Sequence, residues 1–331
     1  MKKILTTMVA AAACYAGVAS AAEIQPAVVY DLGGKFDRSF NQAAYTGAEK
    51  YKTDTGTEYR DFEIQNDSQR EQALRNFARR GMNPIVAIGF SQASALEKVA
   101  TEFPDIRFTI VDMVVDLPNV QSVVFKEHEG SFLVGVLAAM ASKTDKVGFV
   151  GGMDIPLIRK FACGYVQGVK YASADAEVFQ NMTGTTGSAW NDPVKGGELA
   201  KSQFDRGADV IYHAAGGTGI GVLQAAADAG KLGIGVDSNQ NGLHPGSILT
   251  SMLKRVDVAV YDAFDAATKE EWKSGLTILG LAEGGVDWAL DEYNAPLITD
   301  DMKAVVKKAT DEIVAGTLSV HDYMSDSSCP M

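Results

Sequence analysis

The sequence is poor in cysteine, in histidine and in positive charge, and each shortage excludes a class of protein. Three cysteines in 331 residues are too few for a disulfide-rich scaffold. Lys and Arg total 30 against 42 Asp and Glu, giving a net charge of −12, which argues against nucleic acid or an anionic membrane surface as the partner. The four histidines are scattered, and no HExxH, CxxC or His/Cys cluster has metal-ligand spacing. We therefore expect neither a metal nor another cofactor.

A long apolar run near the amino terminus indicates export. Lys2 and Lys3 precede an apolar segment at residues 4–18, and Ala19–Ala21 has the small-x-small pattern of a cleavage site. These features predict a secretory signal peptide over residues 1–22 and a periplasmic mature protein.

The cysteines leave two alternatives open. Cys14 lies in a loose lipoprotein box, without the usual Leu three residues earlier, so a lipid anchor at Cys14 is a second possibility for the amino terminus. Cys163 and Cys329 could pair in an oxidising compartment. The interpretation we favour is a small buried residue at 163 and a free thiol in the tail at 329.

Short apolar runs then alternate with helical patterns in two successive series. The first begins with a strand at 26–30 and a helix at 39–52 and continues to apolar runs at 107–111 and 120–125. The second begins with a helix at 131–142 and ends with a strand at 232–236. Such βα alternation predicts an α/β protein with two doubly wound lobes, each a parallel sheet covered by helices on both faces.

The alternation breaks after Asp237, and this predicts how the lobes are joined. The remaining elements are expected at residues 247–253, 256–274, 277–281, 285–289 and 300–315. They are placed most easily if the chain crosses back between the lobes through a hinge of several strands.

We therefore predict an N-terminal lobe from residues 23–127 plus about 238–270, and a C-terminal lobe from 128–237 plus about 271–331. An exported two-lobed α/β protein with several crossings is typical of solute-binding proteins. Their ligands lie between the lobes, beyond the carboxyl ends of the parallel strands.

Polar or glycine residues stand where several predicted strands end. The residues that could line a cleft in this way are Asp31, Ser91, Asp112, Gly217 and Asp237. Any one of them could be only a helix cap or a turn residue, but together they favour a ligand site. Ser39 and Gln42 have the spacing of a capping box at the start of the first helix.

The motif DLGGKFDRSFNQ at Asp31–Gln42 is the most specific feature of the chain. Together with a series of segments in the same order, it resembles the BMP/PnrA-like substrate-binding proteins of ABC transporters (basic membrane proteins, purine nucleoside receptors) over essentially the whole mature chain. The other matching segments are residues 86–90, 108–112, 191–193, 208–212, 235–237 and 250–254. The resemblance implies a type I periplasmic-binding-protein fold, no enzymatic activity, a nucleoside ligand, and a membrane permease as partner. We expect a monomer, with adenosine, guanosine or inosine as ligand.

The resemblance also implies roles for individual residues. Phe40 and Trp190 would stack on the two faces of the base, the family usually having Phe where this chain has Trp190. Asn41 and Asp112 would hydrogen-bond the base, since Asn both donates and accepts while Asp accepts.

The sugar and the rest of the cleft have their own expected residues. The ribose hydroxyls would be bound by Asp237 and Lys254, and the other polar lining would come from Asp31, Ser91 and Gly217. A carboxylate suits a vicinal diol because both hydroxyls can donate to it.

Other functions remain open at this stage. Another flat ring, such as riboflavin or a free purine base, could occupy the same cleft, and a receptor that signals rather than transports would share every residue. Gly217–Gly219 with Asp237 further on mimics a dinucleotide-binding fingerprint, although its third glycine position is Val222. Residues 89–93 approach the nucleophile elbow of a hydrolase but end in Ala93.

Overall fold

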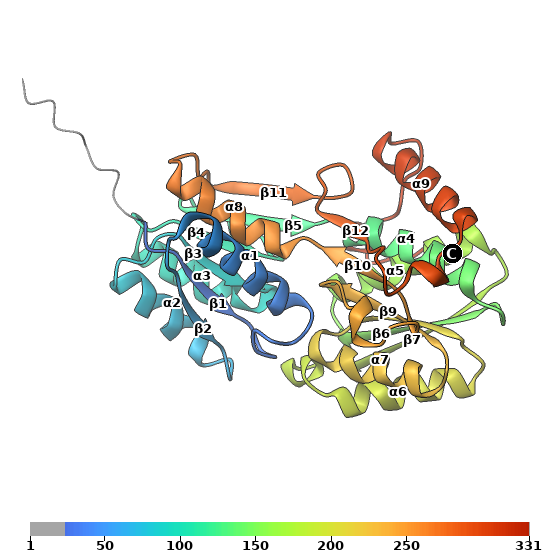
Figure 1. Cartoon of the computed structure of the whole chain (residues 1–331). Coiled ribbons are helices and arrows are strands. Elements are labelled where there is room, and N and C mark those ends of the chain that lie inside the picture. Colours follow the sequence, from blue (N-terminus) through green and yellow to red (C-terminus); the bar gives the residue numbers. More distant parts are fainter. Residues whose placement is uncertain (1–23, 331) are drawn as a thin grey trace, which may run out of the picture.

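The computed structural model describes residues 24–330 and shows two lobes side by side, each built on a six-stranded sheet (Figure 1). The expected signal peptide and the alternative lipid anchor at Cys14 lie outside the described residues. Among the residues that the structure does describe, none of the helices has the length and apolar character needed to cross a membrane.

The first lobe is an all-parallel sheet in the order β11-β5-β4-β3-β1-β2. Its strands are β1 (Ala27–Tyr30), β2 (Arg60–Glu63), β3 (Ile85–Ile88), β4 (Phe108–Val111), β5 (Val120–Phe125) and β11 (Gly275–Leu279). Its helices are α1 (Phe40–Thr55), α2 (Gln69–Arg79), α3 (Ala93–Glu102) and α8 (Val256–Thr268).

Burial on both faces explains why the central strands β1 and β3 are apolar at every position. Along β1, Val28 and Tyr30 pack into the core shared with α1 and α8, whereas Ala27 and Val29 pack into the core shared with α2 and α3. Successive side chains of a strand point to opposite faces, so a strand covered on both sides needs apolar residues at every position.

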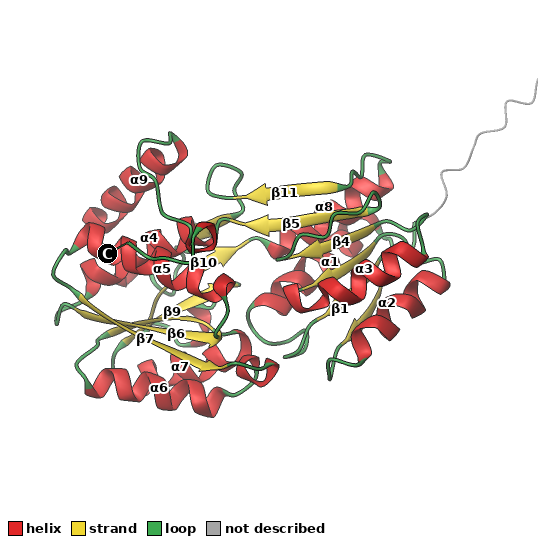
Figure 2. Ribbon diagram, turned by 180° about the vertical axis from the view of Figure 1, so that it is seen from behind, coloured by secondary structure: helices red, strands yellow, loops and turns green. Residues whose placement is uncertain are grey.

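The second lobe has the sheet order β12-β10-β9-β8-β6-β7, with only β12 antiparallel. Its strands are β6 (Lys146–Met153), β7 (Glu177–Gly184), β8 (Val210–Ala214), β9 (Leu232–Asp237), β10 (Ile248–Lys254) and β12 (Val286–Trp288). Its helices are α4 (Glu127–Ala141), α5 (Pro156–Ala172), α6 (Pro193–Asp205), α7 (Gly219–Asp228) and α9 (Asp300–Val314). Helices α4, α5 and α9 lie on one side of this sheet and α6 and α7 on the other (Figure 2).

The chain crosses between the lobes after β5, after β10 and after β11. The crossings are tied together by backbone hydrogen bonds, from Lys126 N–H to the carbonyl of Leu279 (2.9 Å) and from Arg255 N–H to the carbonyl of Gly285 (2.8 Å). The multi-strand hinge is therefore present.

The sheet assignments of two strands differ from the boundaries expected from the sequence. Strand β10, expected in the first lobe, extends the second sheet beside β9, and β11, expected in the second lobe, pairs with the edge strand β5 of the first. Of the elements within residues 238–270, only α8 packs on the first lobe, against α1. Each of these two strands pairs in parallel with the edge strand of the preceding βα units in the sheet that it joins, β9 for β10 and β5 for β11.

The carboxyl-terminal segment is covalently attached to α5. Cys163 is buried as expected, but it forms a disulfide with Cys329. The expectation of a free tail thiol is therefore wrong, and the pairing alternative is confirmed. Helix α4 also begins at Glu127 rather than at 131, and α8 ends at Thr268 rather than at 274. The earlier start of α4 places Glu127 directly at the first crossing.

Candidate functional site

A cleft between the lobes encloses about 590 Å³ of empty space, part of it open to solvent. It is lined by Asp31, Leu32, Asp37, Phe40, Asn41, Gly89, Phe90, Asp112, Leu157, Ile158, Phe161, Trp190, Ala214, Gly216, Val236, Asp237 and Lys254. The residues predicted from strand ends and from the motif are thus brought together, except Ser91 and Gly217, which lie directly behind the lining.

The loop between β1 and α1 is organised by a buried carboxylate that the sequence analysis did not select. Asp37 accepts hydrogen bonds from the backbone N–H groups of Ser39 (2.8 Å), Asn41 (3.0 Å) and Gln42 (3.1 Å). The capping box predicted for Ser39 and Gln42 is therefore wrong, because Asp37 satisfies the first N–H groups of α1. The Ser39 hydroxyl is left to donate across the cleft to Asp237 Oδ2, at 2.6 Å.

The Asn41 amide is used mainly to hold this loop. Its Oδ1 accepts from the backbone N–H of Asp31 (3.0 Å) and its Nδ2 donates to Asp37 Oδ2 (3.2 Å). These bonds fix the start of α1, where Phe40 is the first residue and faces the cleft.

Asp31 is also fully engaged within the protein. Its Oδ1 accepts from the N–H of Leu32 (2.8 Å) and from Arg70 Nη2 (2.9 Å), and its Oδ2 accepts from the Ser91 hydroxyl. Ser91 therefore acts on Asp31 rather than facing the cleft. A Cβ at Gly89, where φ is 104°, would lie 2.6 Å from Asp31 Oδ2, so only glycine fits there.

Two aromatic side chains face the cleft from opposite lobes, Phe40 from α1 and Trp190 from the loop before α6. The indole of Trp190 lies against the backbone of Gly152 at the end of β6, where a Cβ would come within 2.2 Å of Cζ3. Gly217 packs behind the same residue, and its Cβ position is 3.2 Å from the Trp190 carbonyl oxygen. The sequence analysis missed Gly152, whose lack of a side chain makes room for the larger ring.

The cation of the cleft, Lys254, is buried and held by two carboxylates. Its Nζ lies 2.7 Å from Asp112 Oδ2, 2.9 Å from Glu127 Oε1, and 5.1 Å from the centre of the Phe40 ring. Burial alone would lower the pKa of Lys254, but Asp112 and Glu127 outweigh it and raise the pKa above its ordinary value. The ammonium is therefore protonated, and the carboxylates of Asp112 and Glu127 balance its positive charge.

Asp112 keeps one oxygen for another partner. Burial raises its pKa, although the charge of Lys254 opposes this. The Oδ1 atom is buried and has no hydrogen-bond partner among residues 24–330. An unsatisfied buried carboxylate oxygen is unfavourable, and a donor entering the cleft would satisfy it.

Asp237 joins the two lobes at the end of β9. Burial raises the pKa of Asp237 to about 7, while Lys254 and the Ser39 hydroxyl partly counteract the increase. Next to it, Ser238 Oγ donates to the carbonyl of Ser39 (2.7 Å) and Gln240 Nε2 to the carbonyl of Arg38 (2.9 Å). These contacts hold the lobes closed over the cleft.

No group of three or more His, Cys, Asp or Glu side chains within 24–330 is placed to bind a metal ion. The side chains of the cleft are suited to an uncharged ligand with a flat ring and hydroxyl groups, because aromatic side chains line it from both lobes and its one ammonium is paired with carboxylates.

Comparison with known proteins identifies the family. The sequence model described as "ABC transporter substrate-binding protein PnrA-like" matches residues 24–322. The chain belongs to this family. The PnrA-like proteins are substrate-binding components of ABC transporters, as the resemblance implied.

Individual relatives agree with this family. The chain is 34% identical over 321 residues to the "ABC transporter nucleoside-binding protein BmpA" of Lactococcus lactis, covering 90% of this chain and 89% of BmpA. It is 36% identical over 298 residues to an uncharacterized lipoprotein of Pyrococcus furiosus, covering 85% and 74% of the two chains. A solved solute-binding protein of an ABC transporter system from Aeropyrum pernix superposes with a TM-score of 0.83 at 29% identity, covering 89% of this chain and 92% of that one. The predicted periplasmic-binding fold is confirmed.

Proposed function

We propose that this PnrA-like protein binds a purine nucleoside between its lobes and delivers it to a membrane permease. The observation that carries the proposal is the pairing of aromatic and polar groups in one cleft. Phe40 and Trp190 enter from opposite lobes, and Asp112, Asp237 and Lys254 stand beside them. A nucleoside has this combination of properties: a flat base with a polar edge, joined to a sugar with two adjacent hydroxyls.

The polar atoms still available match those groups. Asp112 Oδ1 can accept from an N–H group of the base. One oxygen of Asp237 is taken by Ser39, which leaves the other to accept from the ribose hydroxyls. Lys254 donates one N–H group to Asp112 and forms an ion pair with Glu127, and it can donate another N–H group to a ribose oxygen. The ligand needs no phosphate group to balance the charge of Lys254, because Asp112 and Glu127 already do so.

The relatives support the ligand and the location. The printed name of the Lactococcus protein is that of a nucleoside-binding protein, and the Pyrococcus protein is named as a lipoprotein. We infer that this chain likewise acts outside the cytoplasm, as a monomer. The Asn41, Asp31, Ser91 and Gly217 positions serve the site indirectly, by holding the loops that carry the contacting groups.

Ligand binding and lobe closure are coupled in this proposal. A nucleoside that contacts both lobes favours the closed form over the open form. The bonds of Ser39 to Asp237 and to Ser238 are made only when the lobes meet. The closed form is then the one that the permease recognises.

Titration calorimetry tests the ligand class. Adenosine, guanosine, inosine, uridine, riboflavin and the free purine bases are titrated into protein purified without added ligand, and we expect a purine nucleoside to bind tightest. Base stacking is worth about 1–3 kcal/mol per base, so Phe40→Ala and Trp190→Ala should each weaken binding by roughly fivefold to 150-fold.

The matched control is Phe36→Ala, since Phe36 lies in the loop just before α1, four residues from Phe40, but is 61% exposed and outside the cleft. This variant should bind like the unaltered protein. Tighter binding of riboflavin or of a free base would replace the nucleoside proposal with that ligand. Unchanged affinity in both Phe40→Ala and Trp190→Ala would refute the stacked arrangement.

A further inference from the structure

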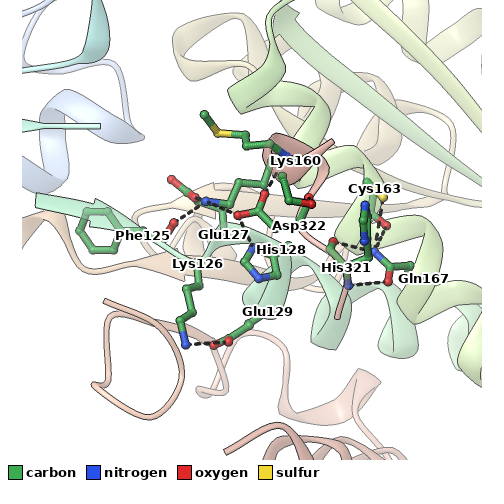
Figure 3. A network of polar contacts seen from close by, with 12 residues as sticks. Phe125, Lys126, Glu127, His128, Glu129, Lys160, Cys163, Gln167, His321 and Asp322 are labelled. Atoms are coloured by element: carbon green, nitrogen blue, oxygen red, sulfur yellow. Dashed lines mark hydrogen bonds and ion pairs between the residues drawn. The ribbon is translucent and has the colours of Figure 1, made fainter. Parts of the chain in front are cut away.

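A buried row of alternating charges runs from the cleft to the carboxyl-terminal segment. Lys254 Nζ lies 2.9 Å from Glu127 Oε1, and the other oxygen of Glu127 lies 2.9 Å from Lys160 Nζ. Lys160 also donates to the carbonyl of Phe125 (2.7 Å) and lies 3.6 Å from Asp322 Oδ2. Figure 3 shows Lys160 between Glu127 and Asp322, with the Phe125 carbonyl beside it. Only Asp322 is substantially exposed.

The outer end of this row is anchored to α5. Gln167 forms two hydrogen bonds with the backbone of His321, accepting from its N–H (2.8 Å) and donating to its carbonyl (3.0 Å) (Figure 3). The disulfide between Cys163 and Cys329 closes the segment a few residues further on. Asp322 is thereby held beside Lys160, and Lys160 cannot turn away from Glu127 without leaving its own partners.

We propose that Glu127 is a positioning residue for the ligand site: it fixes the Lys254 ammonium so that its remaining N–H group points at the ribose hydroxyls. Lys160 holds Glu127 in place from the opposite side. This inference rests on the proposed nucleoside function and adds a residue that does not itself line the cleft.

The chemistry of lysine makes such a second anchor necessary. Its ammonium is a compact charge on a flexible four-carbon stem, and one partner alone would let it rotate. Asp112 comes from the end of β4 in the first lobe, and Glu127 comes from the start of α4 at the crossing, so the two carboxylates fix Nζ from different elements. Burial would raise the pKa of Glu127, but the charges of Lys254 and Lys160 outweigh burial and lower it to about 2. Glu127 is therefore ionised at every physiological pH.

A cycle that pairs a protein variant with a ligand variant tests the proposal. Glu127→Gln keeps the size of the side chain and removes its charge. The ligands are the tightest binder among adenosine, guanosine and inosine, and the 2′,3′-dideoxy form of the same nucleoside. A hydrogen bond to a charged group contributes about 1.5–3 kcal/mol. Glu127→Gln should therefore weaken the binding of the nucleoside roughly tenfold or more and leave the affinity for the dideoxy form nearly unchanged.

The control is Glu129→Gln. Glu129 lies in the same first turn of α4, but it contacts Lys126 (3.2 Å) and the N–H of Leu281 (2.8 Å) rather than Lys254. The Glu129→Gln variant should bind both ligands with the affinity of the unaltered protein. Should Glu127→Gln fail to fold, Lys160→Met replaces it in the test. This variant should also lose more affinity for the nucleoside than for its dideoxy form, but the loss should be smaller than in Glu127→Gln.

Equal losses for the nucleoside and its dideoxy form would overturn the proposal, because a merely structural role weakens both alike. Failure of the unaltered protein to bind any nucleoside would instead refute the proposed function. In that case a crystal structure of Glu127→Gln decides the positioning role. Displacement of Lys254 Nζ from its place beside Asp112 supports the role, and an unchanged position contradicts it.

Discussion

Removal of the disulfide between Cys163 and Cys329 should destabilise the protein without abolishing its fold. The two residues are 166 positions apart in the sequence. In the chain-entropy description, closing a loop of this length lowers the entropy of the unfolded chain by an amount equivalent to roughly 5 kcal/mol at 25 °C. Measured effects of native disulfides are commonly about 2–4 kcal/mol, so we expect a loss in that range.

The assay compares the unaltered protein, with and without a reductant, and a variant in which both cysteines are serine. Replacing both residues avoids leaving a reactive thiol. An unfolding entropy of about 2.1 cal/mol/K per residue corresponds to about 1.5 °C per kcal/mol for a chain of roughly 300 residues, so the Tm should fall by roughly 3–6 °C. Thiol titration of the unfolded, unreduced protein produced without residues 1–22, which contain Cys14, should find no free cysteine.

Two results would refute this reasoning. Two free thiols in the mature protein purified from an oxidising compartment would show that the pair does not form. An equal Tm for the unaltered protein with and without reductant would show that the link does not constrain the unfolded chain. Either would also weaken the inference that Asp322 is anchored beside Lys160.

Further predictions concern the ring and the carboxylate of the cleft. Gly152→Ala introduces a Cβ 2.2 Å from the present position of Trp190 Cζ3. The displaced indole should weaken nucleoside binding about tenfold, measured by calorimetry. The control Gly230→Ala has open space at the Cβ position but strains a turn with φ of 62°, so it should lower stability and leave affinity unchanged. Burial in the closed form raises the pKa of Asp237 to about 7. The contribution of Asp237 to the stability of the closed form is therefore complete below the ordinary Asp pKa near 4 and is lost as pH rises through 7. Small-angle scattering of the ligand-free protein should therefore give a larger radius of gyration at pH 8.5 than at pH 5, and Asp237→Asn should remove this difference; a radius independent of pH in the unaltered protein would contradict the assignment.

Local patterns in the sequence were sufficient to predict the lobes. Strand β1 is apolar at every position because both of its faces are covered, and this is visible without coordinates. The cleft-facing carboxylates Asp112 and Asp237 directly follow such a strand or end it, and parallel strand ends meet at one edge of a sheet. The DLGGKFDRSFNQ motif then added Phe40.

Local patterns did not predict which sheet each late strand joins, nor the contacts of residues that support the cleft from behind. Strands β10 and β11 carry no local signal for the lobe that they join, since the choice depends on which parallel edge is open after folding. Glu127 follows β5 in a Lys-Glu-His-Glu stretch that is typical of an exposed first helical turn. Its burial beside Lys254 follows from the chain crossing at that point, which no spacing along the sequence reveals.

The partners of Asp31 illustrate the same limit of local patterns. Arg70 lies on an ordinary polar helix, α2, and only the packing of α2 against the sheet brings its guanidinium to Asp31. Ser39 has the spacing of a cap, yet its hydroxyl bonds to Asp237 because Asp37 already satisfies the helix. Contacts between lobes thus change the roles that local motifs suggest.

Calorimetric titration of adenosine, guanosine and inosine into the unaltered protein and into Asp237→Ala tests the central claim most directly. Asp237 is the cleft carboxylate that ends β9 and accepts from Ser39 across the lobes. The account predicts tight binding of a purine nucleoside to the unaltered protein, and loss of that binding in Asp237→Ala with the circular dichroism spectrum and cooperative unfolding retained. Unchanged affinity in a folded Asp237→Ala variant would contradict it.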